Sequence, residues 1–77
     1  MIKKQIYEIL NEIAEDIDIT DETLLLDEGI LDSVSILYLV SELEDKNGIH
    51  IPVEEISEEH LKTVSDIEKF VKSKLGD

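Results

Sequence analysis

The sequence predicts an all-α fold: a small four-helix bundle with three longer helices, one short helix and a long loop between the first two helices. Apolar residues recur at spacings of three and four along most of the chain, as the buried stripe of a helix requires. Residues suited to cap or break a helix separate these stretches. No segment shows a strand pattern of useful length, an internal repeat or low complexity. Residues 1–77 are therefore expected to form a single domain, whose core is too small to enclose a deep substrate pocket.

The first helix is predicted from an apolar stripe near the N-terminus and should be about four turns long. The stripe consists of Ile2, Ile6, Ile9, Leu10, Ile13 and Ile17. Residues 18–32 then lose the helical period, yet their leucines and isoleucines make them too apolar for a free linker. A loop of this length in a small domain is usually functional or packed by its own side chains. We expect this loop to be both.

The second helix should begin at Asp32 or Ser33 and run to Lys46 or Asn47. Either starting residue can serve as N-cap by accepting a backbone N–H from the first turn. Gly48 is well suited to the position just after the helix, where the backbone often becomes left-handed.

The remaining helices are predicted from Pro52 and from a second set of capping residues. A short third helical turn is expected over residues 52–56, with glutamates suited to its N-terminal end. The fourth helix should start near Thr63 or Ser65, where Ser65 with Glu68 fits a capping box and Thr63 is the alternative cap. Its predicted buried stripe comprises Ile67, Phe70 and Val71, with Leu75 as a further candidate.

The second helix has apolar residues on two opposite sides. At about 100° per residue, one cluster forms a core face of Ile36, Leu39, Val40, Leu43 and Asn47. The opposite face consists of Val34, Leu37, Tyr38 and Ser41, continued by Glu44 and Asp45. Scattered exposed apolar residues are common. A small apolar spot with an acidic rim, however, is the pattern of a transient docking surface, which is how we interpret this face.

The charge is strongly uneven along the chain. The formal net charge is −13, and 13 acidic side chains but no Lys or Arg occur between Glu8 and Asp45. Such a surface disfavours nucleic acid or an anionic membrane as partner and favours a basic protein patch. The alternative is that the acidity only keeps a small domain soluble.

Several classes of protein are disfavoured by what the sequence lacks. There are no cysteines, so a disulfide scaffold, a thiol nucleophile and a cysteine metal site are all absent. No apolar run is long enough to span a membrane, and no secretory signal is visible. We expect a cytoplasmic monomer without direct membrane insertion. His50 and His60 have no metal-ligand companions at useful spacing and suggest no catalytic triad with a serine.

Ser33 is the strongest candidate for a functional residue. It follows Leu26-Asp27-Glu28-Gly29-Ile30-Leu31-Asp32, an acidic loop that contains a glycine and leads into the second helix. A hydroxyl there would lie at an exposed helix N-terminus, beside backbone N–H groups that favour a phosphate. The simpler interpretation is that Ser33 is only a helix cap.

This motif and its surroundings resemble the attachment site of acyl and aminoacyl carrier proteins over nearly the whole chain. The resemblance implies that Ser33 carries a 4′-phosphopantetheine arm whose thiol holds cargo as a thioester, and that the protein is a carrier, not an enzyme. Asp32 matches the aspartate that helps the transferase recognise the carrier or coordinate its metal-bound complex. In this family the second helix recognises partners, which coincides with the docking face above. The implied partners are a phosphopantetheinyl transferase, an adenylating or acyl-loading enzyme, and a downstream acyltransferase or condensing enzyme.

The motif resembles D-alanyl carriers and free-standing peptidyl carriers more than typical fatty-acid carriers. Ile30-Leu31 stands where fatty-acid carriers favour Gly-Ala or a similar pair, Ser35 where they commonly have an acidic residue, and Tyr38 where they have a glutamate. The cargo itself is set by the loading enzyme and cannot be deduced from this chain.

Two alternatives come from other functional classes. One is a non-covalent acidic interaction module in which Ser33 only caps a helix. The other is a small calcium-binding protein, because Asp16, Asp18, Thr20 and Asp27 sample positions of a calcium loop. In that loop Asp21 would stand where glycine is needed and Asp27 where a glutamate is needed, so no metal site is expected.

Overall fold

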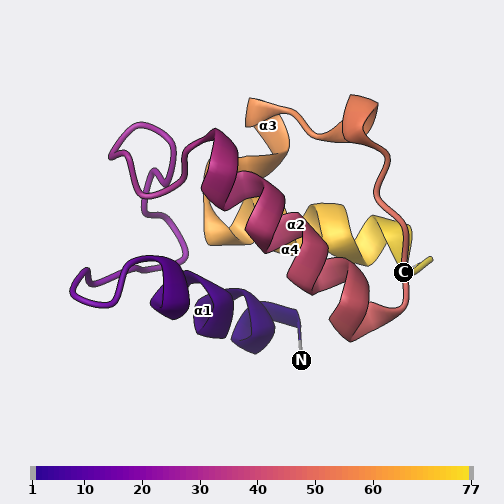
Figure 1. Cartoon of the computed structure of the whole chain (residues 1–77), viewed down its shortest axis with the longest axis horizontal. Helices are drawn as coiled ribbons and strands as arrows, with labels where there is room; N and C mark the ends of the chain where they lie inside the picture. The colour runs from indigo at the N-terminus through magenta and orange to yellow at the C-terminus, as the bar shows by residue number, and fades with distance from the viewer. Residues whose placement is uncertain (1, 77) are drawn as a thin grey trace.

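In the computed structural model, which describes residues 2–76, the chain is a small helical bundle without a strand in that range. Its elements are α1 (Ile2–Ile13), α2 (Ser33–Asn47), the 3-10 turn η1 (Val53–Glu55), α3 (Glu58–Leu61) and α4 (Val64–Lys74). Helix α1 packs against α2 and α4, and α3 packs against α4. Figure 1 shows α2 crossing in front of α4 and the long loop joining α1 to the start of α2. The predicted all-α bundle is confirmed.

Helix α1 is shorter than predicted. Ile6, Ile9 and Leu10 are buried, as the stripe required, but the helix ends at Ile13 and Ile17 is 45% exposed. Acidic residues crowd the segment just beyond Ile13. Negative charge at a helix C-terminus opposes the helix dipole, which accounts for termination before the fourth turn.

The loop between α1 and α2 is anchored in the core, as predicted. Leu25 is fully buried, and its backbone N–H donates to the carbonyl of Lys62 at 2.8 Å. The Leu25 carbonyl accepts from the N–H groups of Ile30 (2.9 Å) and Leu31 (3.1 Å), both of which are also buried. The loop therefore has its own hydrogen-bonded turn around one leucine.

A second tether joins this loop to α1. Asp21 accepts hydrogen bonds from the Tyr7 hydroxyl and from Lys3 Nζ, the latter at 2.9 Å. These two bonds, that of Tyr7 first, hold the pKa of the Asp21 carboxyl below its usual range. Burial and the bond to Asp21 raise the pKa of Tyr7 to about 12. In the sequence, Asp21 was noted only because it occupies the glycine position of a possible calcium loop. Its structural role was not evident, because its partners on α1 lie far away along the chain.

The region after α2 differs from the prediction in one respect. The expected turn over residues 52–56 is the 3-10 turn η1, and the short α-helix of the bundle is α3, which the sequence did not indicate. Glu58 and Glu59 occupy the first turn of α3, where negative charge is favourable, and Leu61 is buried. A helix of four residues is too short to show a helical period, so it escaped detection.

Helix α4 uses Thr63, not Ser65, as its N-cap. The Thr63 hydroxyl accepts from the Asp66 backbone N–H at 3.2 Å, while Ser65 lies inside the first turn, so the Ser65–Glu68 capping box is not formed. The predicted buried stripe of Ile67, Phe70 and Val71 is confirmed, and Val64 joins it. Leu75 is the exception, because it follows the last helical residue and is 38% exposed.

The cap assignment gives a first testable prediction. Thr63→Ala should lower the free energy of unfolding by about 1 kcal/mol, because the Asp66 amide loses its acceptor. Ser65→Ala is the matched control and should change it by less than about 0.5 kcal/mol. Urea unfolding followed by circular dichroism measures both. Equal losses in the two variants would contradict the assignment of Thr63 as the cap.

Candidate functional site

At the junction between the loop and α2, the adjacent residues Asp32 and Ser33 differ in their role. Asp32 is the N-cap, with extended backbone angles (φ −124°, ψ −174°) and a carboxylate that accepts from the Ser35 N–H at 2.8 Å. Ser33 is the first residue of α2 and is exposed. Among residues 2–76, the structure describes no hydrogen bond for the Ser33 hydroxyl. The capping role falls to Asp32, so it does not explain the presence of Ser33.

The electrostatics of this junction combine a carboxylate with a helix N-terminus. Hydrogen bonds from Ser35, first that of its backbone N–H, hold the pKa of the Asp32 carboxyl below its usual range, so Asp32 is ionised at neutral pH. The N–H groups of Ser33 and Val34, the first two residues of α2, have no acceptor within the helix and can donate to an anion, whereas that of Ser35 is bonded to Asp32. A phosphate on Ser33 would therefore meet both the positive end of the helix dipole and the negative charge of Asp32.

The presentation of Ser33 depends on the residues just before it. Gly29 has a positive φ of 74°, a left-handed conformation that glycine adopts without strain. The turn at Gly29 sends Ile30 and Leu31 into the core, where both are buried. Because these two side chains are fixed, Asp32 and Ser33 are held at the surface.

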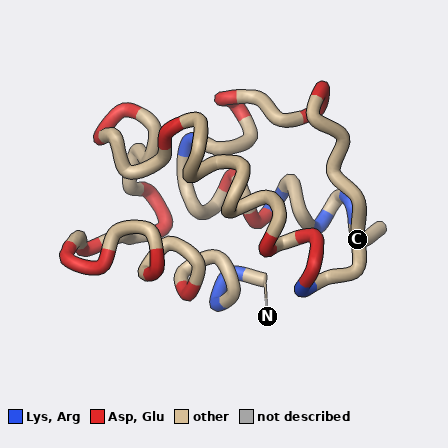
Figure 2. The backbone as a smooth tube through the Cα atoms, in the orientation of Figure 1, with Lys and Arg blue, Asp and Glu red and all other residues tan. Residues whose placement is uncertain are grey.

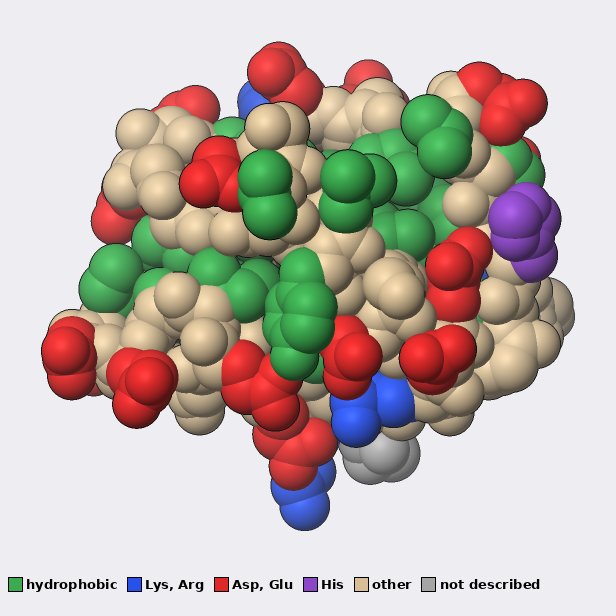
Figure 3. Space-filling view, viewed as in Figure 1, with side chains coloured by type: hydrophobic (Ala, Val, Ile, Leu, Met, Phe, Trp, Pro, Cys, Tyr) green, Lys and Arg blue, Asp and Glu red, His purple; other side chains and the backbone are tan. Residues whose placement is uncertain are grey.

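Helix α2 has the two faces expected of it. Leu39, Val40 and Leu43 are buried, with Ile36 and Asn47 partly buried beside them. On the opposite side, the exposed fraction is 74% for Val34, 59% for Leu37 and 42% for Tyr38, and Ser41 and Asp45 are exposed as well. Figure 3 shows hydrophobic side chains gathered over α2, with acidic side chains around them.

Two residues of this exposed face also have structural partners that the sequence did not reveal. The Tyr38 hydroxyl donates to the Glu12 carboxylate on α1, and this bond, with burial, raises the pKa of Tyr38 to about 12. Glu44 accepts from the Ile51 N–H at 2.7 Å and lies 3.5 Å from His50 Nδ1. Glu44 therefore holds the segment after α2 in place, whereas Asp45 remains exposed.

The 3-10 turn η1 adds an apolar residue near this face. Val53 is 75% exposed, one of the most exposed large hydrophobic residues in the described chain. Figure 3 shows a hydrophobic group near this turn, on the same face of the molecule as those over α2. The apolar spot therefore extends beyond α2, which the sequence did not indicate because η1 and α2 are separated along the chain.

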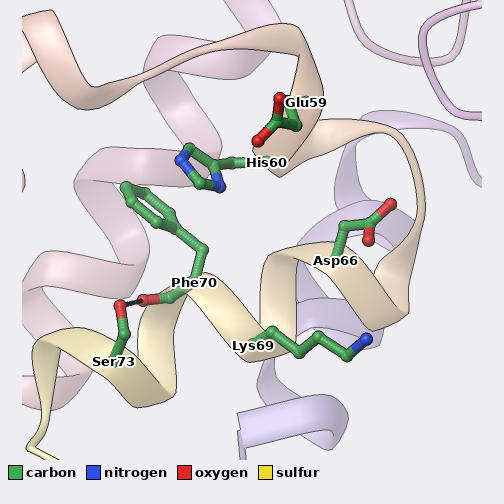
Figure 4. A pocket seen from close by; sticks show the side chains of 6 residues that line it. All are labelled: Glu59, His60, Asp66, Lys69, Phe70 and Ser73. Atoms are coloured by element: carbon green, nitrogen blue, oxygen red, sulfur yellow. Dashed lines mark hydrogen bonds between the residues drawn. The ribbon is translucent and has the colours of Figure 1, made fainter.

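A shallow hollow lies between α3 and α4. His60 on α3 points toward Phe70 on α4, and their rings are stacked with centroids 4.4 Å apart and planes 12° apart (Figure 4). The hollow is lined by Glu59, His60, Asp66, Lys69, Phe70 and Ser73. The sequence suggested no metal or catalytic role for His60; the residue is half-buried, and the stacking gives it a packing role between the two helices.

The described residues offer neither a metal site nor a helix able to span a membrane. Within residues 2–76, no group of three or more His, Cys, Asp or Glu side chains is placed to hold a metal ion. Asp21, from the region that resembled a calcium loop, is engaged by Lys3 and Tyr7. No helix in the described part of the chain is long and apolar enough to cross a membrane.

Comparison with known proteins identifies the family of this chain. The profile of a family described as "Phosphopantetheine attachment site" matches residues 2–71. The chain belongs to this family. Its role is therefore that of a non-catalytic carrier with a phosphopantetheine attachment site, and the family implies partner enzymes such as transferases and ligases.

The names of similar proteins also describe a carrier. The D-alanyl carrier protein of Leuconostoc mesenteroides subsp. mesenteroides is 36% identical over 76 residues, which cover 97% of each chain. That of Streptococcus sanguinis is 38% identical over 68 residues, covering 86% of this chain and 85% of the relative. The motif resemblance to D-alanyl carriers is thus confirmed along most of the chain.

A solved structure shares the fold. A chain from a structure titled "Crystal structure of FAD-dependent dehydrogenase" superposes with a TM-score of 0.78 at 32% identity, covering 87% of this carrier and 97% of that chain. Because nearly all of that chain is covered, it is about as short as this one. The similarity therefore concerns a carrier-sized bundle.

The two faces of α2 give a second prediction. Leu43→Ala should lower the free energy of unfolding by about 2–5 kcal/mol, because it leaves a cavity in the core. Leu37→Ala should change it by less than about 0.5 kcal/mol, yet weaken binding to a loading enzyme by about 1–2 kcal/mol if Leu37 lies near the centre of the contact. Unfolding midpoints and transfer kinetics measure the two effects. If Leu37→Ala destabilised the carrier as much as Leu43→Ala, Leu37 would belong to the core.

Proposed function

We propose that Ser33 carries the 4′-phosphopantetheine arm and that residues 1–77 act as a single carrier domain. The observation that carries this proposal is the division of roles at the start of α2. Asp32 caps the helix through its bond to Ser35, while the Ser33 hydroxyl is exposed and has no described partner among residues 2–76. An accessible hydroxyl at a helix N-terminus is the chemical group that an enzyme needs in order to attach a phosphate ester there.

The arm would be transferred to Ser33 from coenzyme A. Ser33 Oγ attacks the β-phosphorus of the coenzyme A pyrophosphate, a new Oγ–P bond forms, and the P–O bond to adenosine 3′,5′-bisphosphate breaks. The hydroxyl proton must pass to a base on the transferase. His60 is stacked on Phe70, and His50 lies beyond the far end of α2, roughly 20 Å along the helix from Ser33. The transferase therefore supplies the activation, and the carrier supplies a positioned hydroxyl and Asp32 as a recognition group.

The cargo would be held as a thioester on the arm's terminal thiol. The names of the similar proteins make D-alanine the first cargo to test, activated by an adenylating enzyme. A downstream acyltransferase or condensing enzyme would then remove it. Intact mass spectrometry of the carrier from its own cell, with the thioester preserved, identifies the cargo directly.

The docking face proposed for these enzymes is the exposed side of α2. Val34, Leu37 and Ser41 face outward near the arm, and Val53 extends the apolar area. Asp45 would attract a basic partner, whereas Tyr38 and Glu44 would serve both the face and the fold, since each already holds another element. The cytoplasmic location and the monomeric state expected from the sequence remain predictions.

The attachment site gives a third prediction. Treatment with coenzyme A and a broad-specificity transferase should add the mass of one phosphopantetheine group, and Ser33→Ala should abolish this addition. Because Ser33 is not the cap, the alanine variant should retain its free energy of unfolding to within about 0.5 kcal/mol. Ser57→Ala, at an exposed serine before α3 that makes no side-chain cap bond, is the matched control and should accept the arm normally. Efficient modification of Ser33→Ala would assign the arm to another residue and refute the proposal.

A further inference from the structure

Attachment of the arm at Ser33 creates a charge problem for this carrier. A phosphodiester carries a permanent negative charge, and it would sit beside ionised Asp32. The chain from Glu8 to Asp45 contains 13 acidic residues and no Lys or Arg. The first N–H groups of α2 offset part of this charge. A full positive charge nearby would have to come from another part of the chain.

Lys62 is brought to this region by the backbone. Its carbonyl accepts from the Leu25 N–H at 2.8 Å, and the Leu25 carbonyl accepts from the Leu31 N–H at 3.1 Å. Leu31 directly precedes Asp32, so two hydrogen bonds connect Lys62 to the start of α2. Leu61, Leu25 and Leu31 are also buried in one core cluster, which fixes this arrangement.

The side chain of Lys62 is available for a new partner. Lys62 is exposed, although its neighbours Leu61 and Thr63 are buried, and the structure describes no ion pair for it among residues 2–76. Its ammonium is a compact charge on a flexible four-carbon stem, so it can reach groups near its fixed backbone. Figure 2 shows that acidic residues predominate along the long loop between α1 and α2, the region to which the Lys62 backbone is bonded.

The other lysines are placed less favourably. Lys46 lies at the far end of α2, roughly 20 Å along the helix from Ser33. Lys4 is near that same end, because Gln5 beside it accepts from Asn47 at 2.9 Å. Three more lysines have acidic partners in the structure, namely Lys3, Lys72 and Lys74. Lys69 lines the hollow between α3 and α4 (Figure 4).

We propose that Lys62 is the positive counter-charge for the phosphodiester of the arm, a role that rests on the proposed attachment at Ser33. In the unmodified carrier its ammonium is solvated. In the modified carrier it attracts the phosphodiester oxygens, offsets their repulsion from Asp32 and restricts the direction in which the arm leaves α2.

The test compares the carrier with and without the arm in four forms: wild type, Lys62→Gln, Lys62→Arg and the matched control Lys69→Gln. Intact mass confirms the arm in each sample. The measurement is made at about 0.1 M salt, where exposed charges interact over about 10 Å, so that only charges close to the arm contribute. Any gain in melting temperature on attaching the arm should be smaller in Lys62→Gln than in wild type, and any loss should be larger. The expected difference is about 1–6 °C, the range for one exposed charge pair in a domain of this size.

Several outcomes separate this role from others. Lys62→Arg should behave as wild type because it keeps the charge, Lys69→Gln should respond to the arm as wild type does, and the gap should close at about 1 M salt as the charges are screened. If attaching the arm changed the melting temperature equally in wild type and Lys62→Gln, the proposal would be overturned. This holds even if the transferase modified Lys62→Gln more slowly, because Lys62 would then act only in recognition by the transferase. If the arm lowered the melting temperature, relative to its effect on wild type, by the same amount in Lys62→Gln and Lys69→Gln, the effect would come from net charge alone, and a specific role of Lys62 would be contradicted. Failure to add the arm to wild type would instead refute the attachment itself, which the mass reveals.

Discussion

The burial of Leu25 is the constraint on which the rest of this structure depends. Its side chain is fully buried between the helices, its N–H bonds to Lys62, and its carbonyl receives the N–H groups of Ile30 and Leu31. Full burial of a leucine contributes about 1.5–3 kcal/mol, which helps to offset the entropy of ordering a long loop. One residue thereby joins the loop, the start of α2 and the junction of α3 with α4.

This anchoring explains how a carrier without catalytic residues can still present a well-defined site. The loop ends at buried Leu31, so Asp32 and Ser33 emerge at a fixed place on the surface. Asp32 uses its carboxylate for the cap, and the adjacent Ser33 hydroxyl stays free for the attachment that we propose. The same helix buries Leu39 and Leu43 and exposes Val34 and Leu37, so that the proposed attachment residue and the proposed docking face lie on one helix.

The sequence predicted features whose physical signals are local. Helix α2 was placed to within a residue, because a capping aspartate precedes it and Gly48, with a positive φ of 62°, follows it. The candidate site was found for the same reason, since the motif is contiguous. Helix α3 was missed because one helical turn has no period, and the end of α1 was placed too late because the apolar spacing continues to Ile17 after the helix ends.

Roles that depend on distant contacts could not be deduced from the sequence. Asp21 holds α1 through Tyr7 and Lys3, and Glu44 holds the segment after α2, yet both resemble ordinary acidic surface residues in the sequence. Choosing between Thr63 and Ser65 as the cap likewise required knowing that Thr63 is buried beside the core. In each case the role of the residue depends on contacts with residues that are distant in the sequence.

Amide hydrogen exchange at Leu25 tests the central claim most directly. If its anchoring holds the site, the Leu25 N–H should exchange only through global unfolding, as slowly as the amide of Leu43 in the buried part of α2. The Glu22 amide, which bonds only to an exposed threonine hydroxyl at 3.3 Å, should exchange far faster and serves as the internal reference. Exchange at Leu25 as fast as at Glu22 would show that the loop opens independently of the bundle, which would contradict this account of how Ser33 is held in place.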